Sequence, residues 1–311
     1  MKRRVRIAAA LAAALPGWGC GPGAGMGEAP ADRGVAEVAR VTGVFRSAGG
    51  VRLGVPLAVA VDFDGVAFIA DASPARLVAY RPAEGLAQEF EAPPTPGFYP
   101  TGVGVHGFFV YAVDETGRQL LRFERRGSFR DVLLNFEELI ERRRVSPHGL
   151  AVDATGRLAV TDIENHQVIV LDNYLNVEVA FGNYGVHAGQ MIEPLGVSFA
   201  PRAELLVADT GNRRVQVFTD GGVYRRTLPP ADTPNPMRRP SAAVSGPDGH
   251  VYVADRGAER VFVFTPAGTL VRALVPEAVT RFEPTAVAFS SGGALFVTDA
   301  ASRALFILKV M

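Results

Sequence analysis

The chain repeats one pattern six times, and this repetition limits its fold more than any other feature. A proline opens each repeat unit, and an aspartate follows 14 or 15 residues later. The prolines are Pro56, Pro100, Pro147, Pro194, Pro240 and Pro284, and the aspartates are Asp71, Asp114, Asp162, Asp209, Asp255 and Asp299. Successive aspartates are 43 to 48 residues apart, a period typical of the blades of a β-propeller.

Each unit also has the residue pattern of β-strands. Short runs of β-branched and aromatic residues are separated by turn dipeptides such as Asp64-Gly65 and Asp248-Gly249, which predicts hairpins. Three strands per unit are plain, and a fourth follows in most units, for example over residues 268–274. Four-stranded units arranged radially predict an all-β, six-bladed propeller over residues 35–311.

The last unit lacks a fourth strand, because the sequence stops at Met311 directly after the third. An unpaired edge strand invites association with other chains. Residues 35–45, which precede the first unit, have strand character. We therefore expect this N-terminal segment to supply the missing outer strand and to close the ring.

The fourth unit carries the signature Ala208-Asp209, Asn212 and Arg214-Val215, which resembles the NHL repeat. The third and fifth units keep most of this signature, and the Gly-rich connector at residues 181–190 also matches such repeats. The resemblance covers about residues 35–311 and implies a six-bladed NHL propeller.

One segment departs from the β pattern. Residues 135–144 place apolar side chains at Phe136, Leu139 and Ile140, with acidic residues early and basic residues late. This pattern predicts a short amphipathic helix, which we expect on one face near the mouth of the channel.

The N-terminus predicts export. A basic head, an apolar run over residues 7–15 and small residues before Cys20 form a signal-peptide layout over residues 1–19. Residues 15–20 resemble a bacterial lipobox, which implies lipidation of Cys20; the alternative is ordinary cleavage that leaves a free thiol. Residues 20–34 are then the lipidated cysteine and a flexible tether. We expect an exported protein, lipid-anchored in the bacterial outer membrane or periplasm.

The charge of the mature chain argues against nucleic acid as a partner. The 32 basic and 32 acidic residues cancel, but the signal segment removes four basic ones, which leaves 28 against 32. A slightly acidic exported domain lacks the basic surface that binding to phosphate backbones needs.

The six aspartates are best explained by architecture, because a residue present once per unit serves what all units share. An aspartate at a strand end accepts backbone N–H groups of the following turn. Arg76, Arg214 and Arg260 recur five residues after the aspartate, and we expect them to support neighbouring turns.

Functional residues are sought where the units differ. The position after each proline should lie near the channel, and the polar residues there are Thr101, His148, Ser241 and Thr285. We expect these four to face a ligand, together with Tyr184 and His187 of the long connector. A run at Arg142 to Arg144, with Arg125 and Arg126, is either a basic patch or a solvated helix face.

The loop at Pro147-His148-Gly149 resembles the one in which peptidyl-α-hydroxyglycine lyases, also six-bladed NHL propellers, place zinc-binding histidines. The equivalent position of the other five units lacks histidine, and a zinc site takes three protein ligands. We therefore predict no metal, no cofactor and no catalytic set.

Two functions follow as hypotheses. The first is a non-enzymatic scaffold at the cell envelope, a monomeric propeller that binds a protein or a polysaccharide and reaches the membrane through its lipid anchor. The alternative is a channel-centred lyase or hydrolase with His148 as acid or base. A propeller fold alone does not decide between them.

Overall fold

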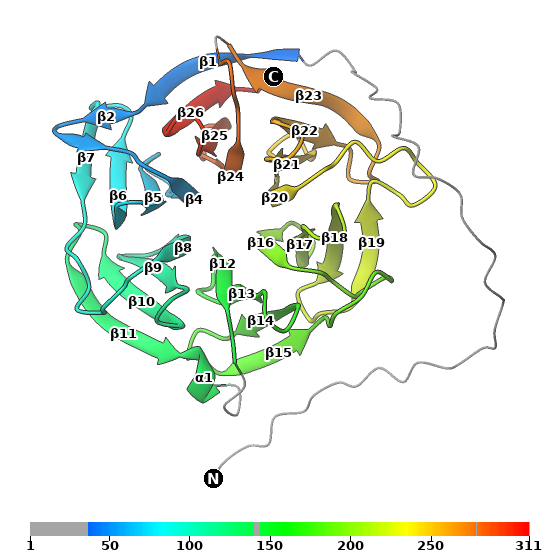
Figure 1. Ribbon diagram of the computed structural model, residues 1–311, viewed down its shortest axis with the longest axis horizontal. Coiled ribbons are helices and arrows are strands. Elements are labelled where there is room, and N and C mark those ends of the chain that lie inside the picture. The colour runs from blue at the N-terminus through cyan, green and yellow to red at the C-terminus, as the bar shows by residue number, and fades with distance from the viewer. Residues whose placement is uncertain (1–36, 140–143, 278, 311) are drawn as a thin grey trace.

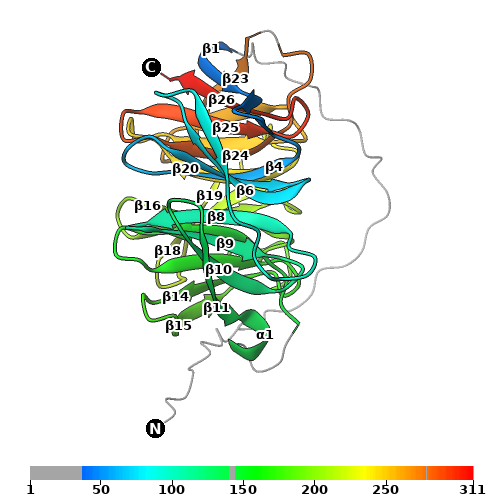
Figure 2. The same cartoon turned by 90° about the vertical axis from the view of Figure 1, so that its left-hand side faces the viewer.

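The computed structural model describes residues 37–139, 144–277 and 279–310. The repeat units lie around a central axis in a closed ring (Figure 1), and the side view shows a disc of stacked sheets (Figure 2). The chain is thus an all-β propeller. The predicted signal segment, Cys20 and the tether lie outside the described residues. Within the described ranges no helix is long and apolar enough to cross a membrane.

The first four units each form a separate four-stranded antiparallel sheet, with the first strand nearest the axis (Figure 1). The strands of these sheets are β4 (Pro56–Val61), β5 (Ala67–Ala72), β6 (Ala75–Arg81) and β7 (Leu86–Glu89); β8 (Pro100–His106), β9 (Phe109–Asp114), β10 (Gln119–Glu124) and β11 (Phe129–Asn135); β12 (Pro147–Val152), β13 (Leu158–Asp162), β14 (Gln167–Leu171) and β15 (Val177–Phe181); and β16 (Pro194–Ala200), β17 (Glu204–Asp209), β18 (Arg214–Thr219) and β19 (Tyr224–Leu228).

The last two units share one eight-stranded sheet, in the order β20-β21-β22-β23-β1-β26-β25-β24. Its strands are β1 (Glu37–Phe45), β20 (Pro240–Ser245), β21 (Val251–Asp255), β22 (Arg260–Phe264), β23 (Leu270–Pro276), β24 (Pro284–Phe289), β25 (Ala294–Asp299) and β26 (Ala304–Lys309). A small hairpin, β2 (Ser47–Ala48) and β3 (Val51–Arg52), follows β1.

The N-terminal strand closes the ring. β1 pairs antiparallel with β26, from Arg40 opposite Lys309 to Phe45 opposite Leu305. The prediction that the segment before the first unit supplies the outer strand of the last unit is therefore confirmed. The first residues of β1 also pair in parallel with β23, which the sequence did not indicate. This second pairing joins the last two units into one sheet.

The two ends of the sheets differ in what they carry. In every unit the opening proline lies opposite the aspartate that ends the second strand. We call this end, with the connectors between units, the Pro–Asp face. The opposite end carries the turns between first and second strands and between third and fourth strands, and we call it the hairpin face.

Apolar packing between successive units holds the ring together. The second strand of the first unit, β5, is buried along its whole length, and a cluster of buried apolar side chains lies between each unit and the next. At the closure, Phe45 of β1 stacks on Tyr80 of the first unit with 4.2 Å between ring centroids. The ring therefore closes through side chains as well as through β1.

The predicted helix begins where expected. α1 (Phe136–Leu139) follows β11, and Asn135 accepts a hydrogen bond from the N–H of Glu137, which is a helix N-cap contact. Residues 140–143 lie outside the described residues. The expected place near the channel mouth is wrong: α1 lies at the outer rim (Figure 1), because it follows the outermost strand of its unit.

Candidate functional site

The repeat aspartates connect two loops of the Pro–Asp face. All six are fully buried. Each accepts a hydrogen bond from the connector before the first strand of its unit. The donors are the N–H groups of Gly54, Val55, Tyr99, Ser146, Ile192, Arg238, Arg239 and Glu283. In three units the turn after the second strand adds a backbone donor, at Asn165, Ala258 and Ser302. The aspartates therefore act in the architecture.

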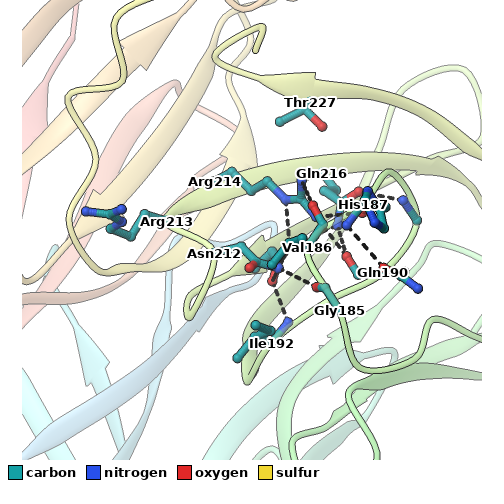
Figure 3. Close-up of polar contacts among 12 residues, drawn as sticks. Gly185, Val186, His187, Gln190, Ile192, Asn212, Arg213, Arg214, Gln216 and Thr227 are labelled. Carbon is teal, nitrogen blue, oxygen red and sulfur yellow. Dashed lines mark hydrogen bonds and ion pairs between the residues drawn. The ribbon is translucent and has the colours of Figure 1, made fainter. Parts of the chain in front are cut away.

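The fourth unit shows this network in its fullest form (Figure 3). Arg214 donates through Nε to Asp209 at 2.7 Å, and its terminal nitrogens donate to three connector carbonyls. Those carbonyls belong to Val186, His187 and Gln190. Asp209 also accepts from Ile192, Asn212 and Gln216. The connector at residues 182–193 is thereby fixed to the fourth unit.

The second unit lacks this arrangement. Asp114 accepts a hydrogen bond from the N–H of Tyr99 at 3.0 Å, but its Oδ2 is buried without a partner, as is Oε1 of Gln119. Gln119 lies opposite Asp114 in the sheet, at the position that Arg214 has in the fourth unit. Burial raises the pKa of the Asp114 carboxyl above its usual range, and the backbone N–H groups of Tyr99, Gly117 and Thr116 oppose this shift.

Next to this irregular position lies a pair of titratable side chains. Nδ1 of His148 is 3.1 Å from Oε2 of Glu115, which directly follows Asp114. Both side chains are about one-quarter exposed. An ionised carboxylate only accepts hydrogen bonds, so this contact favours the neutral tautomer of His148 with the proton on Nδ1 and the lone pair on Nε2. No hydrogen bond joins Nε2 to another of the described residues.

A cavity of about 520 Å³ adjoins Glu115 on the Pro–Asp face, between the second and third units. Glu115 and Ser146 line it, and Oγ of Ser146 is 3.5 Å from Oε1 of Glu115. Two cations, Arg118 and Arg144, also line it. Arg118 pairs with Glu137 of α1, whereas Arg144 is exposed and has no ion pair among the described residues. Glu164 is a second acid in the lining, whereas His148 does not line the cavity and reaches it only through its contact with Glu115.

Three of the predicted ligand-facing residues are buried between units. The hydroxyls of Thr101, Ser241 and Thr285 donate to carbonyls of the next unit, at His148, Pro284 and Pro56 respectively. Thr161 and Thr210 make equivalent bridges to the fourth and fifth units. These hydroxyls link neighbouring units around the axis. Contact of Thr101, Ser241 or Thr285 with a ligand stays a prediction.

The other two predicted residues lie on the fixed connector. Tyr184 is 67% exposed, and its ring lies 5.1 Å from that of His166. His187 is exposed and anchors the connector through its backbone, since its carbonyl accepts from Arg214. The structure does not bring either residue into the cavity beside His148, which other residues line. Their role in binding stays a prediction.

Sequence reasoning missed Glu115. The residue after the repeat aspartate is acidic in the second unit alone, and this exception was a usable signal. The contact between Glu115 and His148 gave no signal in the sequence, because it joins two units. The basic patch is not formed as a whole: Arg125 and Arg126 lie at the hairpin face and Arg144 at the Pro–Asp face, since β11 runs between them, and Arg142 lies outside the described residues.

Among the described residues, no three His, Cys, Asp or Glu side chains are placed to hold a metal ion. The remaining histidines, His106, His166, His187 and His250, have separate partners in different loops. The side chains present do not fit a metal centre, so we derive no reaction step through one.

Residues 58–301 match the family described as SMP-30/Gluconolactonase/LRE-like region. A stretch of 45 residues is 44% identical to the B-box type zinc finger protein ncl-1 of Caenorhabditis elegans and 42% identical to Protein brain tumor of Drosophila melanogaster. This stretch is 14% of the chain and spans only 5% and 4% of the two relatives.

Solved structures of several enzymes have a similar fold. A luciferin-regenerating enzyme superposes with a TM-score of 0.65 at 13% identity, covering 83% of this chain and 92% of that one. A catalytically inactive histidine-to-alanine variant of virginiamycin B lyase from Staphylococcus aureus, with quinupristin, superposes with a TM-score of 0.61 at 16% identity, covering 82% and 80%. At these identities the likeness concerns the fold alone.

Proposed function

This chain belongs to the SMP-30/gluconolactonase/LRE-like family of propellers, and from that premise we propose that it is an acid–base enzyme, a lyase or hydrolase. The observation that carries the proposal is the contact between His148 and Glu115 beside a cavity on the Pro–Asp face. A carboxylate that holds an imidazole in one tautomer is a recurring arrangement of general bases. The family description names a gluconolactonase, so esters and lactones are the first substrates to consider.

The geometry assigns each group a task. Glu115 accepts a hydrogen bond from Nδ1–H of His148, and the lone pair of Nε2 then points away from the carboxylate. In a hydrolysis, Nε2 takes a proton from water while the water oxygen bonds to the ester carbonyl carbon, the acyl C–O bond breaks, and the proton goes to the leaving alkoxide. In a lyase reaction, Nε2 takes the proton from the carbon next to a carbonyl, a C=C bond forms, the C–O bond on the following carbon breaks, and the proton goes to the leaving oxygen. The exposed guanidinium of Arg144 attracts a negatively charged substrate oxygen.

The proposal is tested by turnover of a panel of lactones and linear and cyclic esters. We expect His148→Ala to lower kcat/KM at least about 100-fold for any substrate that the wild type converts. His250 offers a matched control, because its Nδ1 lies 2.9 Å from Asp248 on the hairpin face, and His250→Ala should leave turnover unchanged. Turnover that survives His148→Ala would overturn the proposal, as would a wild type that converts no member of the panel.

We also infer that the propeller has six blades of the NHL kind. The eight-stranded sheet consists of β20 to β23 followed by β1, β26, β25 and β24, which are two four-stranded groups that share an edge. The repeated proline and aspartate pairs number six, and the Asp209 signature supports the NHL type.

A second candidate function is the envelope scaffold. The observation that favours it is the fixed connector at residues 182–193, which presents Tyr184 and Val186 at 67% and 61% exposure. Rigid, exposed aromatic side chains are typical anchors of protein interfaces. On this hypothesis a lipid on Cys20 holds the propeller at the envelope, and a protein or polysaccharide binds the connector. Capture of an envelope partner by the wild type, but not by Tyr184→Ser, would support it.

A further inference from the structure

A second, larger cavity lies on the hairpin face, away from His148. Its volume is about 920 Å³, and turns of the sixth, first and second units line it, which are neighbours around the ring (Figure 1). Sites for small organic ligands in proteins have volumes of about 300 to 1,000 Å³. The size of this cavity therefore suits an organic molecule rather than an inorganic ion.

Aromatic side chains form much of its wall. Phe68 and Phe296 are buried at its base, and Phe109 is half-buried at its side. Phe108, in the turn between β8 and β9, is 83% exposed at the rim. An exposed aromatic ring at the rim of a cavity offers an apolar face against which the ring of a ligand can pack.

The charged residues of the wall divide into paired and unpaired groups. Arg125 binds Asp64 and also Asp62, and Arg130 pairs with Glu124 at 3.2 Å. Arg81 and Arg126 have no ion pair with any described residue. Of the acidic residues that line the cavity, Glu84 alone has no ion pair with a described residue. Two free cations against one free anion leave the cavity with a preference for negative charge.

We propose that this cavity binds an organic anion with an aromatic body. The ring of the ligand lies against Phe108, because Arg122 and Arg130 already lie over the ring of Phe109. Its carboxylate, sulfonate or phosphate accepts hydrogen bonds from Arg81 and Arg126. The site is separate from the one at His148, because the two lie on opposite faces of the disc. It does not depend on the enzymatic proposal.

Calorimetry with 2-naphthoate, using the full-length purified protein, tests the proposal. We expect saturable binding, and weaker binding of the neutral analogue 2-naphthalenemethanol. Phe108→Ala and Arg126→Ala should each weaken binding of 2-naphthoate at least about fivefold. Glu84→Gln should strengthen it, since it removes the unpaired acid.

Two exposed residues outside the cavity supply matched controls. Tyr174 is 81% exposed in the turn between β14 and β15, and Arg225 is exposed on β19. Tyr174→Ala and Arg225→Ala should leave the affinity unchanged. Absence of saturable binding at millimolar 2-naphthoate would overturn the proposal. Equal loss of affinity in the control variants, or none in Phe108→Ala and Arg126→Ala, would also overturn it.

Discussion

Asp209 and Asp114 hold the same position in two repeat units but have opposite surroundings. Asp209 accepts from Arg214, Asn212, Gln216 and the connector. Asp114 has only backbone N–H groups around its carboxyl, its Oδ2 makes no well-formed hydrogen bond with a described residue, and it faces Gln119 instead of an arginine. Where the repeat is complete, its polar groups are used to fix a connector.

Where the repeat is incomplete, titratable side chains of two units meet. Glu115 follows Asp114 directly and binds His148 of the next unit, and a cavity opens beside them. The residues that depart from the repeat thus lie next to the candidate site. A buried polar group without a partner lowers stability, and such costs are commonly found at functional sites.

The largest expected effect is a difference in stability between variants of the two aspartates. Asp209→Asn removes the negative charge beside the largely buried Arg214, and we expect a loss of about 3 kcal/mol in the free energy of unfolding. Asp114→Asn should cost less than about 1 kcal/mol, because no cation faces it and the new amide can donate to Oε1 of Gln119. Denaturant unfolding of both variants at pH 7 measures the difference; equal losses would contradict the comparison.

A second variant gives the fourth unit the residue that the second unit has opposite its aspartate. Arg214→Gln removes the donor to the carbonyls of Val186, His187 and Gln190. We expect a loss of about 2 kcal/mol in the free energy of unfolding and faster amide exchange over residues 182–193. Denaturant unfolding measures the first, and hydrogen exchange followed by mass spectrometry measures the second. Unchanged exchange in the connector would show that Arg214 does not fix it.

The reverse exchange should stabilise the second unit. Gln119→Arg places a guanidinium opposite Asp114, as in the fourth unit, and gives its free oxygen a partner. We expect a gain of about 1 kcal/mol in unfolding free energy. Thermal unfolding beside the wild type tests this, and a loss of stability would mean that the second unit has no room for the arginine.

The smallest effect concerns pH. The pKa of Asp114 is raised in the folded state by burial, so the folded protein binds a proton more readily than the unfolded one above the ordinary value of about 3.9. This contribution to stability is present at low pH and is lost as the pH rises through the folded pKa. The stability of the wild type relative to Asp114→Asn should therefore fall between pH 4 and pH 7. A relative stability that rises over this range would contradict the assignment.

Much of the fold is predictable because it repeats. Six proline and aspartate pairs indicate the propeller, and the missing fourth strand of the last unit indicates its replacement by β1. The pairing of β1 with β23 is not predictable, since it depends on two units being neighbours in space. The same limit applies to the site: His148 stands out in the sequence, but Glu115 is 33 residues away along the chain. Thr101 and Ser241 were placed near the axis, yet only the structure shows that their hydroxyls bridge units.

The most direct test of the central claim is the tautomer of His148, measured by NMR of protein with ¹⁵N-labelled histidine at pH 8. We expect a protonated Nδ1 and an unprotonated Nε2 in the wild type, and loss of that preference in Glu115→Ala. His250, bound to Asp248, serves as an internal reference that should not change. Protonation at Nε2 in the wild type, or a tautomer indifferent to Glu115→Ala, would contradict the claim that Glu115 prepares His148 as a base.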